Sequence, residues 1–450
     1  MLDDARMQEL RTRLRGPLLA PGDDGYDDAR QVFNRMIDKR PDAMARCAGA
    51  GDVIAGVNFA RQHDLPVAVR GGGHSIAGKS VCDGGLLIDL SLMKGIRVDP
   101  ARRRAQAEPG LRLGEFDRET QSFGLATPLG VITNTGIAGL TLGGGIGWLN
   151  GKYGLSCDNV ISLDVVTADG RFLTASATKN EDLFWALRGG GGNFGVVTSF
   201  EYRLHRVGPV LAGMVIYPWE KAKEVFRFFL EFSAGCPDEL TTMAALLSGP
   251  DGIPVAAVAV CYCGSIAKGK KLLKPLRSFG PPAADQIQPM SYVAVQSMFD
   301  GAAPLGHQHY WKSGFTRALN DEAIEIIVEF MSRKPSTSTL CYLQQLHGVA
   351  GRVAADAAAF SHRGDQHNFD IIAQWPDPAD NERNIAWTRD FFAAIEPHLD
   401  RGVYVNTLGE EGEERVRAAY GPNYDRLAAV KSKYDPANFF RLNQNIQPAV

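Results

Sequence analysis

Residues 66–78 read PVAVRGGGHSIAG, and this stretch decides how the rest of the chain is interpreted. A short apolar run leads through Arg70 into three consecutive glycines, and His74 follows them directly. Consecutive glycines let the backbone adopt φ > 0 and present its N–H groups without side chains in the way. Such concave arrays of amides suit phosphate or pyrophosphate, and a histidine adds a titratable, nucleophilic ring. The stretch therefore predicts a strand that ends in a phosphate-binding loop.

The composition is that of an ordinary globular protein with little net charge. A length of 450 residues predicts two or three domains. Lys and Arg number 48 against 51 Asp and Glu, a net charge of −3, and no basic block points to nucleic acid or an anionic membrane as a partner. The start, MLDDARMQEL, has no basic and apolar leader, and no run of about 18 apolar residues is present. We therefore expect a cytoplasmic protein that acts on a small molecule.

The seven cysteines are scattered along the chain. Cys261 and Cys263 form a C-x-C pair, and no second pair of cysteines or histidines completes a zinc site. We expect reduced thiols and no metal centre.

Two nucleotide-binding patterns occur in the chain, but each lacks its structural context. Residues 73–80 match the Walker A pattern, which requires a helix that begins at its lysine. Here Lys79 is followed by a turn and a strand-like run. Gly190-x-Gly192-x-x-Gly195 matches the dinucleotide fingerprint, yet it follows a predicted helix and precedes a strand, the reverse of the required order. The order of elements therefore argues against a nucleotide site at either pattern.

Glycine is abundant, at 49 residues, and most of the excess falls into clusters. After the first cluster, a second extends from Gly130 to Gly147 and a third from Gly189 to Gly195. Tight turns could explain any one of them. All three together favour one long ligand threaded between elements, and FAD, with its adenine, pyrophosphate and isoalloxazine, is such a ligand.

The pattern of predicted secondary structure changes near residue 208. Between about 210 and 400, strand-like runs alternate with long helical stretches and the glycine loops are absent, which is typical of an α+β domain. From Gly402 onward the sequence again predicts loops and helices.

Several motifs, in their order along the chain, resemble the berberine bridge enzyme-like branch of the vanillyl-alcohol-oxidase flavoprotein superfamily. The resemblance covers essentially the whole chain. It rests on RGGGHS at 70–75, the glycine loop at 139–147, KYGL at 152–155 with Asp158 and Asn159, LFWALRGGGGNFGVV at 183–197, and YDPANFFR at 434–441 with Asn443 and Asn445.

The resemblance implies an α+β fold with a two-part PCMH-type FAD-binding domain, residues 1–207 and 402–450. Residues 208–401 would form a substrate domain, an antiparallel sheet flanked by helices. Positions carried over as cofactor-binding are Arg70, Gly71, Gly72, Gly73, His74, Ser75, Gly78, Gly130, Thr135, Gly136, Gly139, Leu140, Gly143, Gly144, Gly147, Trp148, Tyr153, Gly154, Cys157, Asp158, Asn159, Gly195, Val196, Val197, Tyr404, Asn443 and Asn445.

The resemblance also implies how FAD is attached. His74 is the counterpart of the histidine that bonds to the flavin 8α-methyl group. Some family members add a second bond from a cysteine in a G-V-C-x-x-x-G stretch, but that stretch here carries Ile132 in its place. We therefore expect a single covalent attachment, with Cys157 only a residue of the cofactor's surroundings.

The implied chemistry is transfer of a hydride from a carbon next to oxygen or nitrogen to flavin N5. We expect an oxidase of a small polar alcohol, sugar or cyclic amine that passes the electrons to O2 and gives H2O2. Thr135 occupies the position that governs oxygen access in the family. The glutamate base of plant members is absent, since its place falls near Arg352. Tyr404 is the catalytic or substrate-orienting candidate, because Tyr404-x-Asn406 keeps part of the family's Y-x-N-Y segment.

Further side chains on strand-like segments could face the flavin, namely Tyr310, Trp311, Lys312, Ser313, Gln345 and Gln374. Three other functions stay open. They are an FAD-dependent dehydrogenase that uses an acceptor other than O2, a P-loop nucleotide-binding protein, and a non-catalytic ligand-binding flavoprotein. The sequence leaves the substrate and the oligomeric state undetermined.

Overall fold

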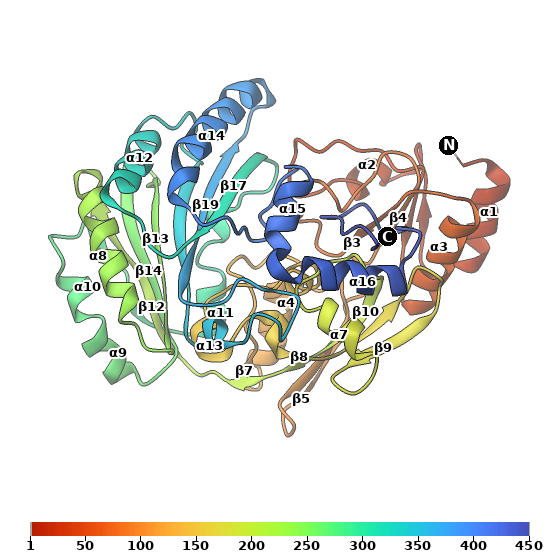
Figure 1. Cartoon of the computed structure of the whole chain (residues 1–450), viewed down its shortest axis with the longest axis horizontal. Coiled ribbons are helices and arrows are strands. Elements are labelled where there is room, and N and C mark those ends of the chain that lie inside the picture. Colours follow the sequence, from red (N-terminus) through yellow and green to blue (C-terminus); the bar gives the residue numbers. More distant parts are fainter. Residues whose placement is uncertain (1, 450) are drawn as a thin grey trace.

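The computed structural model describes residues 2–449 and arranges them in two lobes (Figure 1). Both ends of the chain lie in one lobe, which contains a four-stranded and a five-stranded sheet. The other lobe is built on an eight-stranded sheet. Strands and helices are mixed throughout, which confirms the predicted α+β class.

The four-stranded sheet carries the first glycine loop at the end of one strand. β2 and β3 run parallel to β4 and β1 pairs antiparallel with β2, in the order β1-β2-β4-β3. The predicted apolar strand is β3, and helices α1 and α3 pack on the sheet's hydrophobic side. Bounds are β1 Leu18–Leu19, β2 Ala43–Arg46, β3 Val67–Arg70, β4 Leu86–Asp89, α1 Asp4–Arg13, α2 Tyr26–Ala29 and α3 Ala50–Gln62.

The five-stranded sheet is antiparallel, in the order β5-β6-β10-β8-β9. Gly170 (φ 80°) lies in the tight turn between β8 and β9, where Asp169-Gly170 is a pair that favours a hairpin turn. Helices α4, α7 and α16 (Tyr424–Tyr434) share its core. Bounds are β5 Ile96–Asp99, β6 Arg104–Ala107, β7 Leu125–Ala126, β8 Val160–Val166, β9 Phe172–Ser176, β10 Val196–Arg203, β11 His205–Arg206, α4 Leu113–Gln121, α5 Ile137–Leu142, α6 Asn150–Tyr153 and α7 Glu181–Ala186.

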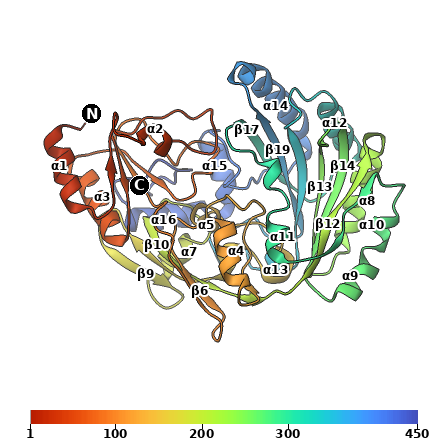
Figure 2. The same cartoon turned by 180° about the vertical axis from the view of Figure 1, so that it is seen from behind.

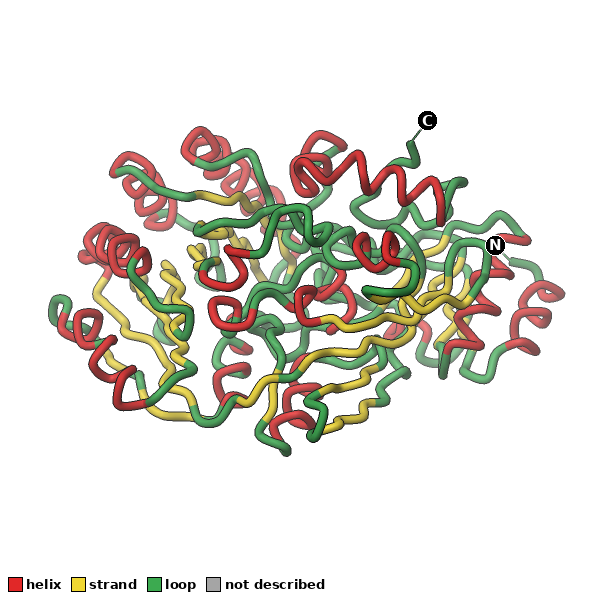
Figure 3. The backbone as a smooth tube through the Cα atoms, turned by 60° about the horizontal axis from the view of Figure 1, so that its bottom comes forward, coloured by secondary structure: helices red, strands yellow, loops and turns green. Residues whose placement is uncertain are grey.

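The eight-stranded sheet of the second lobe is antiparallel throughout. α8, α12 and α14 cover one face of the sheet (Figure 2), where helices lie over the strands in Figure 3 as well. Their apolar side chains form a hydrophobic core with that face. The opposite face turns toward the first lobe. Bounds are β12 Val210–Pro218, β13 Leu240–Ser248, β14 Pro254–Tyr262, β15 Ala284–Asp285, β16 Gln288–Met290, β17 Gln308–Thr316, β18 Leu340–Leu346, β19 Gln366–Trp375, α8 Ala222–Ala234, α9 Ile266–Leu272, α10 Lys274–Ser278, α11 Tyr292–Gln296, α12 Asp321–Ser332, α13 Gly348–Arg352 and α14 Asn381–Ile395.

The C-terminal segment returns to the first lobe through α15 (Glu413–Tyr420) and α16 (Tyr424–Tyr434) (Figure 1). The buried ammonium group of Lys431 pairs with Asp435 at 2.6 Å and donates to the carbonyl of Asn193 at 2.8 Å. The Asn193 side chain accepts from the Ile446 amide at 2.9 Å. The end of the chain therefore holds the third glycine cluster in place.

Both misleading nucleotide patterns lack their helix. Turns follow Lys79 until β4 begins, and residues 190–195 connect the end of α7 to β10. No described helix is both long and apolar enough to cross a membrane.

Candidate active site

A large open cavity lies between the glycine loops of the first lobe and the uncovered face of the eight-stranded sheet. Its empty space is about 1910 Å³, the mouth included. More than half of the predicted cofactor positions line it. They are Gly71, Gly72, Gly73, His74, Ser75, Gly130, Thr135, Gly136, Gly139, Leu140, Gly195, Val196, Val197, Tyr404 and Asn443.

The first two glycine clusters meet at Gly72 and Gly136. A β-carbon on either residue would lie far inside 3.0 Å of the other's backbone nitrogen, so both positions require glycine. Gly73 has φ 73°, a conformation that other residues rarely adopt. The contact leaves a side-chain-free backbone cradle, which fits the pyrophosphate of FAD.

The C-terminal segment adds unpaired polar atoms near this cradle. Asn443 donates to the carbonyl of Phe440 at 2.9 Å, but its own Oδ1 is buried and has no hydrogen-bond partner among residues 2–449. Asn445 Oδ1, outside the cavity wall, is in the same situation. Buried polar atoms without partners are costly, so these amides fit a bound polar ligand.

His74 lies half-buried at the cavity wall with its ring stacked on Phe33, at 4.2 Å between centroids and 15° between planes. Burial lowers the His74 pKa to about 4, a shift that the nearby Arg112 charge increases and hydrogen bonding with Asn134 partly offsets. The imidazole is therefore neutral at physiological pH, and a ring nitrogen can act as a nucleophile.

The far wall of the cavity is formed by polar side chains of β18 and β19 together with Trp311 of the adjacent β17. Tyr342 on β18 and Ser313 on β17 both lie across from Asp370 on β19. Two residues along, Gln344 lies across from Asn368. Side chains at alternate positions of a strand share a face, and Tyr342, Gln344 and Asn368 line the cavity. The intervening residues of β18 and β19, Cys341, Leu343, Phe369 and Ile371, belong to the core beneath the helices.

Asp370 is completely buried behind this row. Its Oδ2 accepts a short hydrogen bond from Asn368, and Oδ1 has no hydrogen-bond partner of good geometry among the described residues. Burial raises the Asp370 pKa to about 6, although the Ser313, Tyr342 and Thr407 hydroxyls and the Asn368 amide counteract the rise. The group can therefore exchange a proton near neutral pH.

Tyr404 reaches the cavity from the segment before α15. Its Oη accepts from the Gly145 amide at 2.9 Å and from Asn406 Nδ2 at 2.8 Å. Burial raises the Tyr404 pKa to about 12, so the phenol keeps its proton. With both lone pairs occupied, it is arranged to donate a hydrogen bond rather than accept a proton.

Several predicted cofactor positions lie outside the cavity wall and support it instead. Trp148 is buried against Phe299, Tyr153 stacks on His205 at 4.0 Å, and Asn159 bonds to His205 at 2.7 Å. The full set outside the wall is Arg70, Gly78, Gly143, Gly144, Gly147, Trp148, Tyr153, Gly154, Cys157, Asp158, Asn159 and Asn445.

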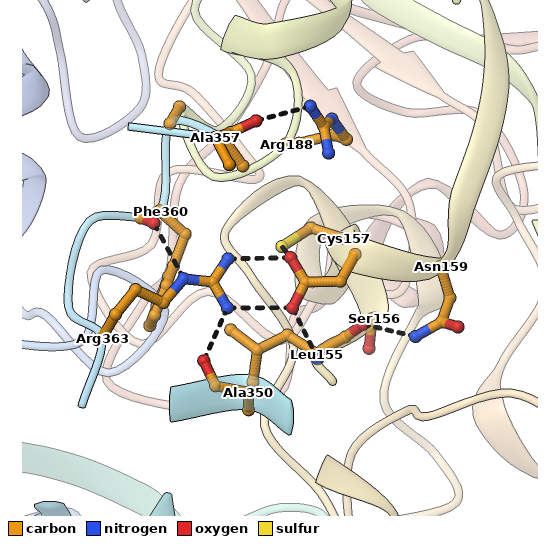
Figure 4. Close-up of polar contacts among 12 residues, drawn as sticks. Leu155, Ser156, Cys157, Asn159, Arg188, Ala350, Ala357, Phe360 and Arg363 are labelled. Carbon is orange, nitrogen blue, oxygen red and sulfur yellow. Dashed lines mark hydrogen bonds and ion pairs between the residues drawn. The ribbon is translucent and has the colours of Figure 1, made fainter. Parts of the chain in front are cut away.

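Figure 4 shows the polar contacts of Arg363, which forms a buried ion pair with Asp158. Arg363 binds both carboxylate oxygens of Asp158, at 2.8 and 2.9 Å, and donates to the carbonyls of Ala350 and Phe360. Cys157 lies beside the pair and is fully buried, which raises the pKa of its thiol. The sulfur is therefore a protonated packing group.

Among the other substrate-domain candidates, only Trp311 lines the cavity. Gln345 bonds to Thr242 and Ser233, and Gln374 donates to the carbonyls of Ala302 and Ser338. Sequence reasoning missed Phe33, Tyr342, Gln344, Asn368 and Asp370. The one local signal was the alternation of polar and apolar residues in NFDI at 368–371.

Comparison with known proteins agrees with this geometry. Residues 41–176 match a family model described as an FAD binding domain, and residues 403–447 match the berberine and berberine-like model. An FAD-linked oxidoreductase of Dictyostelium discoideum is 37% identical over 401 residues, covering 88% of this chain and 86% of the relative. The (R)-6-hydroxynicotine oxidase of Paenarthrobacter nicotinovorans is 32% identical over 456 residues, covering 97% of each protein.

The same fold occurs in the crystal structure of 6-hydroxy-D-nicotine oxidase from Arthrobacter nicotinovorans. That structure is 30% identical, has a TM-score of 0.90 and covers 97% of this chain and 98% of its own. Family models, relatives and fold thus agree with the predicted resemblance, and the chain belongs to the berberine bridge enzyme-like family of FAD-linked oxidoreductases.

Proposed function

We propose that the protein is an oxidase in which a small polar alcohol, sugar or cyclic amine gives a hydride to FAD bound covalently through His74, with O2 as the final electron acceptor. The observation that carries the proposal is the cavity itself. One wall is a glycine backbone cradle with a neutral histidine, and the other is a row of polar side chains on a sheet.

FAD supplies the two-electron acceptor when it is bound. The glycine loops, Asn443 and Asn445 would hold it, with residues 1–207 and 402–450 forming its domain. The polar face of the 208–401 domain would orient the substrate above it. The similarity to a 6-hydroxynicotine oxidase supports an oxidase that accepts a polar ring.

Removing the substrate's hydroxyl or amine proton needs an acceptor within hydrogen-bond reach. The family's glutamate is absent, and Arg352 near its place pairs with Asp238 on the surface. Tyr342 and Asp370 supply an alternative. Tyr342 faces the cavity, and the two groups are close enough for each to shift the other's pKa. In this proposal the Tyr342 hydroxyl takes the substrate proton while the phenolic proton of Tyr342 passes to the Asp370 carboxylate. Tyr404 orients the substrate by donating a hydrogen bond to it.

A single series of measurements tests the proposal. The purified protein is precipitated with acid, and yellow colour that stays with the pellet but is absent from His74→Ala supports the attachment. The protein is then mixed anaerobically with a panel of alcohols, sugars and cyclic amines, and bleaching of the flavin identifies a substrate. On admission of air, H2O2 formed at the rate of substrate oxidation is expected.

Other outcomes would replace parts of this proposal. Colour that washes out of the acid-treated wild type would contradict covalent attachment. Bleaching followed by slow reaction with air but rapid reaction with a dye acceptor would make the protein a dehydrogenase. Flavin that no compound bleaches at any pH would make it a non-catalytic ligand-binding flavoprotein.

A further inference from the structure

Phe33 lies between two histidine rings from different lobes. On one side its ring stacks on His74, at 4.2 Å and 15°, and on the other on His309 of β17, at 4.3 Å and 24°. Trp311 closes the edge of the stack in a T-shaped contact with Phe33 at 6.3 Å. Phe33, His74 and Trp311 all line the cavity. The three stacked rings thus link the first glycine loop to the substrate-facing sheet.

The backbone fixes this stack from both sides. The Phe33 amide donates to the carbonyl of Gly73, directly before His74, at 3.0 Å. Asn34 donates to the carbonyls of Ile76 and His309, and its Oδ1 accepts from the His309 amide, each at 3.0 Å. A segment with anchors to both loop and strand cannot rotate away, so the Phe33 ring is a rigid wall for the His74 imidazole.

A stacked neighbour restricts an imidazole to one ring plane and shields one of its faces from water. Aromatic pairs at such separations contribute roughly 0.5–1.5 kcal/mol beyond the area that they bury. Bond formation needs the reacting nitrogen to be held toward its target, because each misoriented rotamer lowers the population that can react. Among the described aromatic rings, Phe33 alone stacks on His74.

We propose that Phe33 is the positioning residue that holds the His74 ring in the orientation required for its bond to FAD, with His309 supporting Phe33 from behind. This inference rests on the proposed attachment through His74. In the net step, a His74 ring nitrogen forms a bond to the 8α carbon, one methyl C–H bond breaks, and the hydrogens of that C–H bond and of the ring N–H leave as two protons. The two electrons pass to the isoalloxazine and then to O2, which is reduced to H2O2.

The experiment follows the formation of the covalent bond in the purified, FAD-containing protein. Phe33→Leu keeps a buried apolar side chain of similar size but removes the planar ring, whereas Phe33→Tyr keeps the ring. Phe123→Leu, at a side chain that is 46% exposed, is the matched control. Each protein is incubated in air at 25 °C and quenched with acid at intervals. The fraction of its flavin that stays with the precipitated chain is then measured by fluorescence.

We expect Phe33→Leu to contain FAD in the same ratio to protein as the wild type but to form the covalent bond roughly three- to tenfold more slowly. Phe33→Tyr and Phe123→Leu should match the wild type, and His309→Ala should slow bond formation less than Phe33→Leu does. Equal rates in Phe33→Leu and the wild type would overturn the positioning role. If Phe33→Leu loses FAD altogether, the other two variants decide. The positioning role would then be overturned if His309→Ala forms the covalent bond at the wild-type rate and Phe33→Tyr forms it slowly. A wild type without covalent flavin would instead overturn the attachment on which this inference rests.

Discussion

Gly72 and Gly136 lie backbone against backbone, so close that neither has room for a β-carbon. The two loops that would hold the pyrophosphate therefore depend on each other for their shape. Gly72→Ala should push them apart, with an overpacking cost of about 1–3 kcal/mol. We expect purified Gly72→Ala to contain much less FAD than the wild type, measured as the ratio of flavin absorbance to protein absorbance.

The matched control for this prediction is Gly51→Ala in α3, where an added β-carbon meets no atom within 4 Å. Alanine favours a helix, so this variant should keep its FAD and unfold at the same or a slightly higher temperature. Full FAD content in Gly72→Ala would contradict the assignment of this contact to cofactor binding.

The proton acceptor is tested through the pH dependence of flavin reduction. Asp370 has a pKa of about 6, raised by burial, and it accepts protons only as a carboxylate. The rate of anaerobic bleaching by the identified substrate should therefore fall as pH decreases through about 6. Flavin bleaching in Asp370→Asn should be at least tenfold slower than in the wild type, and its rate should no longer fall as pH decreases through about 6. Tyr342→Phe should slow bleaching at every pH.

Asp380→Asn, at an exposed carboxylate beyond the end of the same strand, should leave the profile unchanged. An unaltered acidic limb in Asp370→Asn would show that another group accepts the proton.

The Arg363–Asp158 pair is a stability determinant, since both side chains are at least nine-tenths buried. Arg363→Met would leave the Asp158 carboxylate buried and unpaired, at a cost of about 3–5 kcal/mol. We expect a clearly lower melting temperature by calorimetry. Arg352→Met removes a similar two-pronged pair with Asp238 at the surface and should melt like the wild type. Equal melting temperatures for the two variants would contradict the role of burial.

Asp117 makes the stability depend on pH. It is fully buried between α4 and α11, with Gln296 donating to it at 2.8 Å, and burial raises its pKa to about 7. Because the folded state holds this proton more tightly than the unfolded state, Asp117 lowers stability as pH rises from about 4 to about 7. Asp117→Asn should melt like the wild type at pH 4 and be more stable at pH 8, by up to about 4 kcal/mol.

Glu119→Gln, at an exposed carboxyl on the same helix, serves as the comparison and should have the same stability as the wild type at both pH 4 and pH 8. A constant difference between Asp117→Asn and the wild type at both pH values would exclude proton uptake by Asp117 as the cause.

Much of the first lobe could be predicted, because its ligand-binding loops are rich in glycine and glycine clusters are visible in the sequence. The β3 strand and the missing helix after Lys79 follow from local chemistry, and residues of all three glycine clusters line one cavity, as expected for one long ligand. The sequence did not indicate which side chains face the cavity and which are buried behind its wall. Trp148 and Cys157 stand within cofactor-type motifs, yet both side chains pack behind the cavity wall, and only tertiary packing decides this.

The second lobe gave weaker signals. Every residue of β19 is buried, so Asn368 and Asp370 could not be distinguished from ordinary interior polar groups without knowing which face the helices cover. Phe33 could not be found at all from local pattern, because its neighbours His74 and His309 come from distant parts of the chain.

The large sheet is covered by helices on one face only, and this has a consequence for where substitutions are tolerated. Its packed face fixes the fold, while an exchange at Gln344, which lines the cavity, alters what a bound molecule meets without disturbing the layer behind. A substitution on that cavity-facing row can therefore change binding without repacking the core, whereas Gly72 and Gly136, where one added methyl group collides with backbone, leave no such freedom.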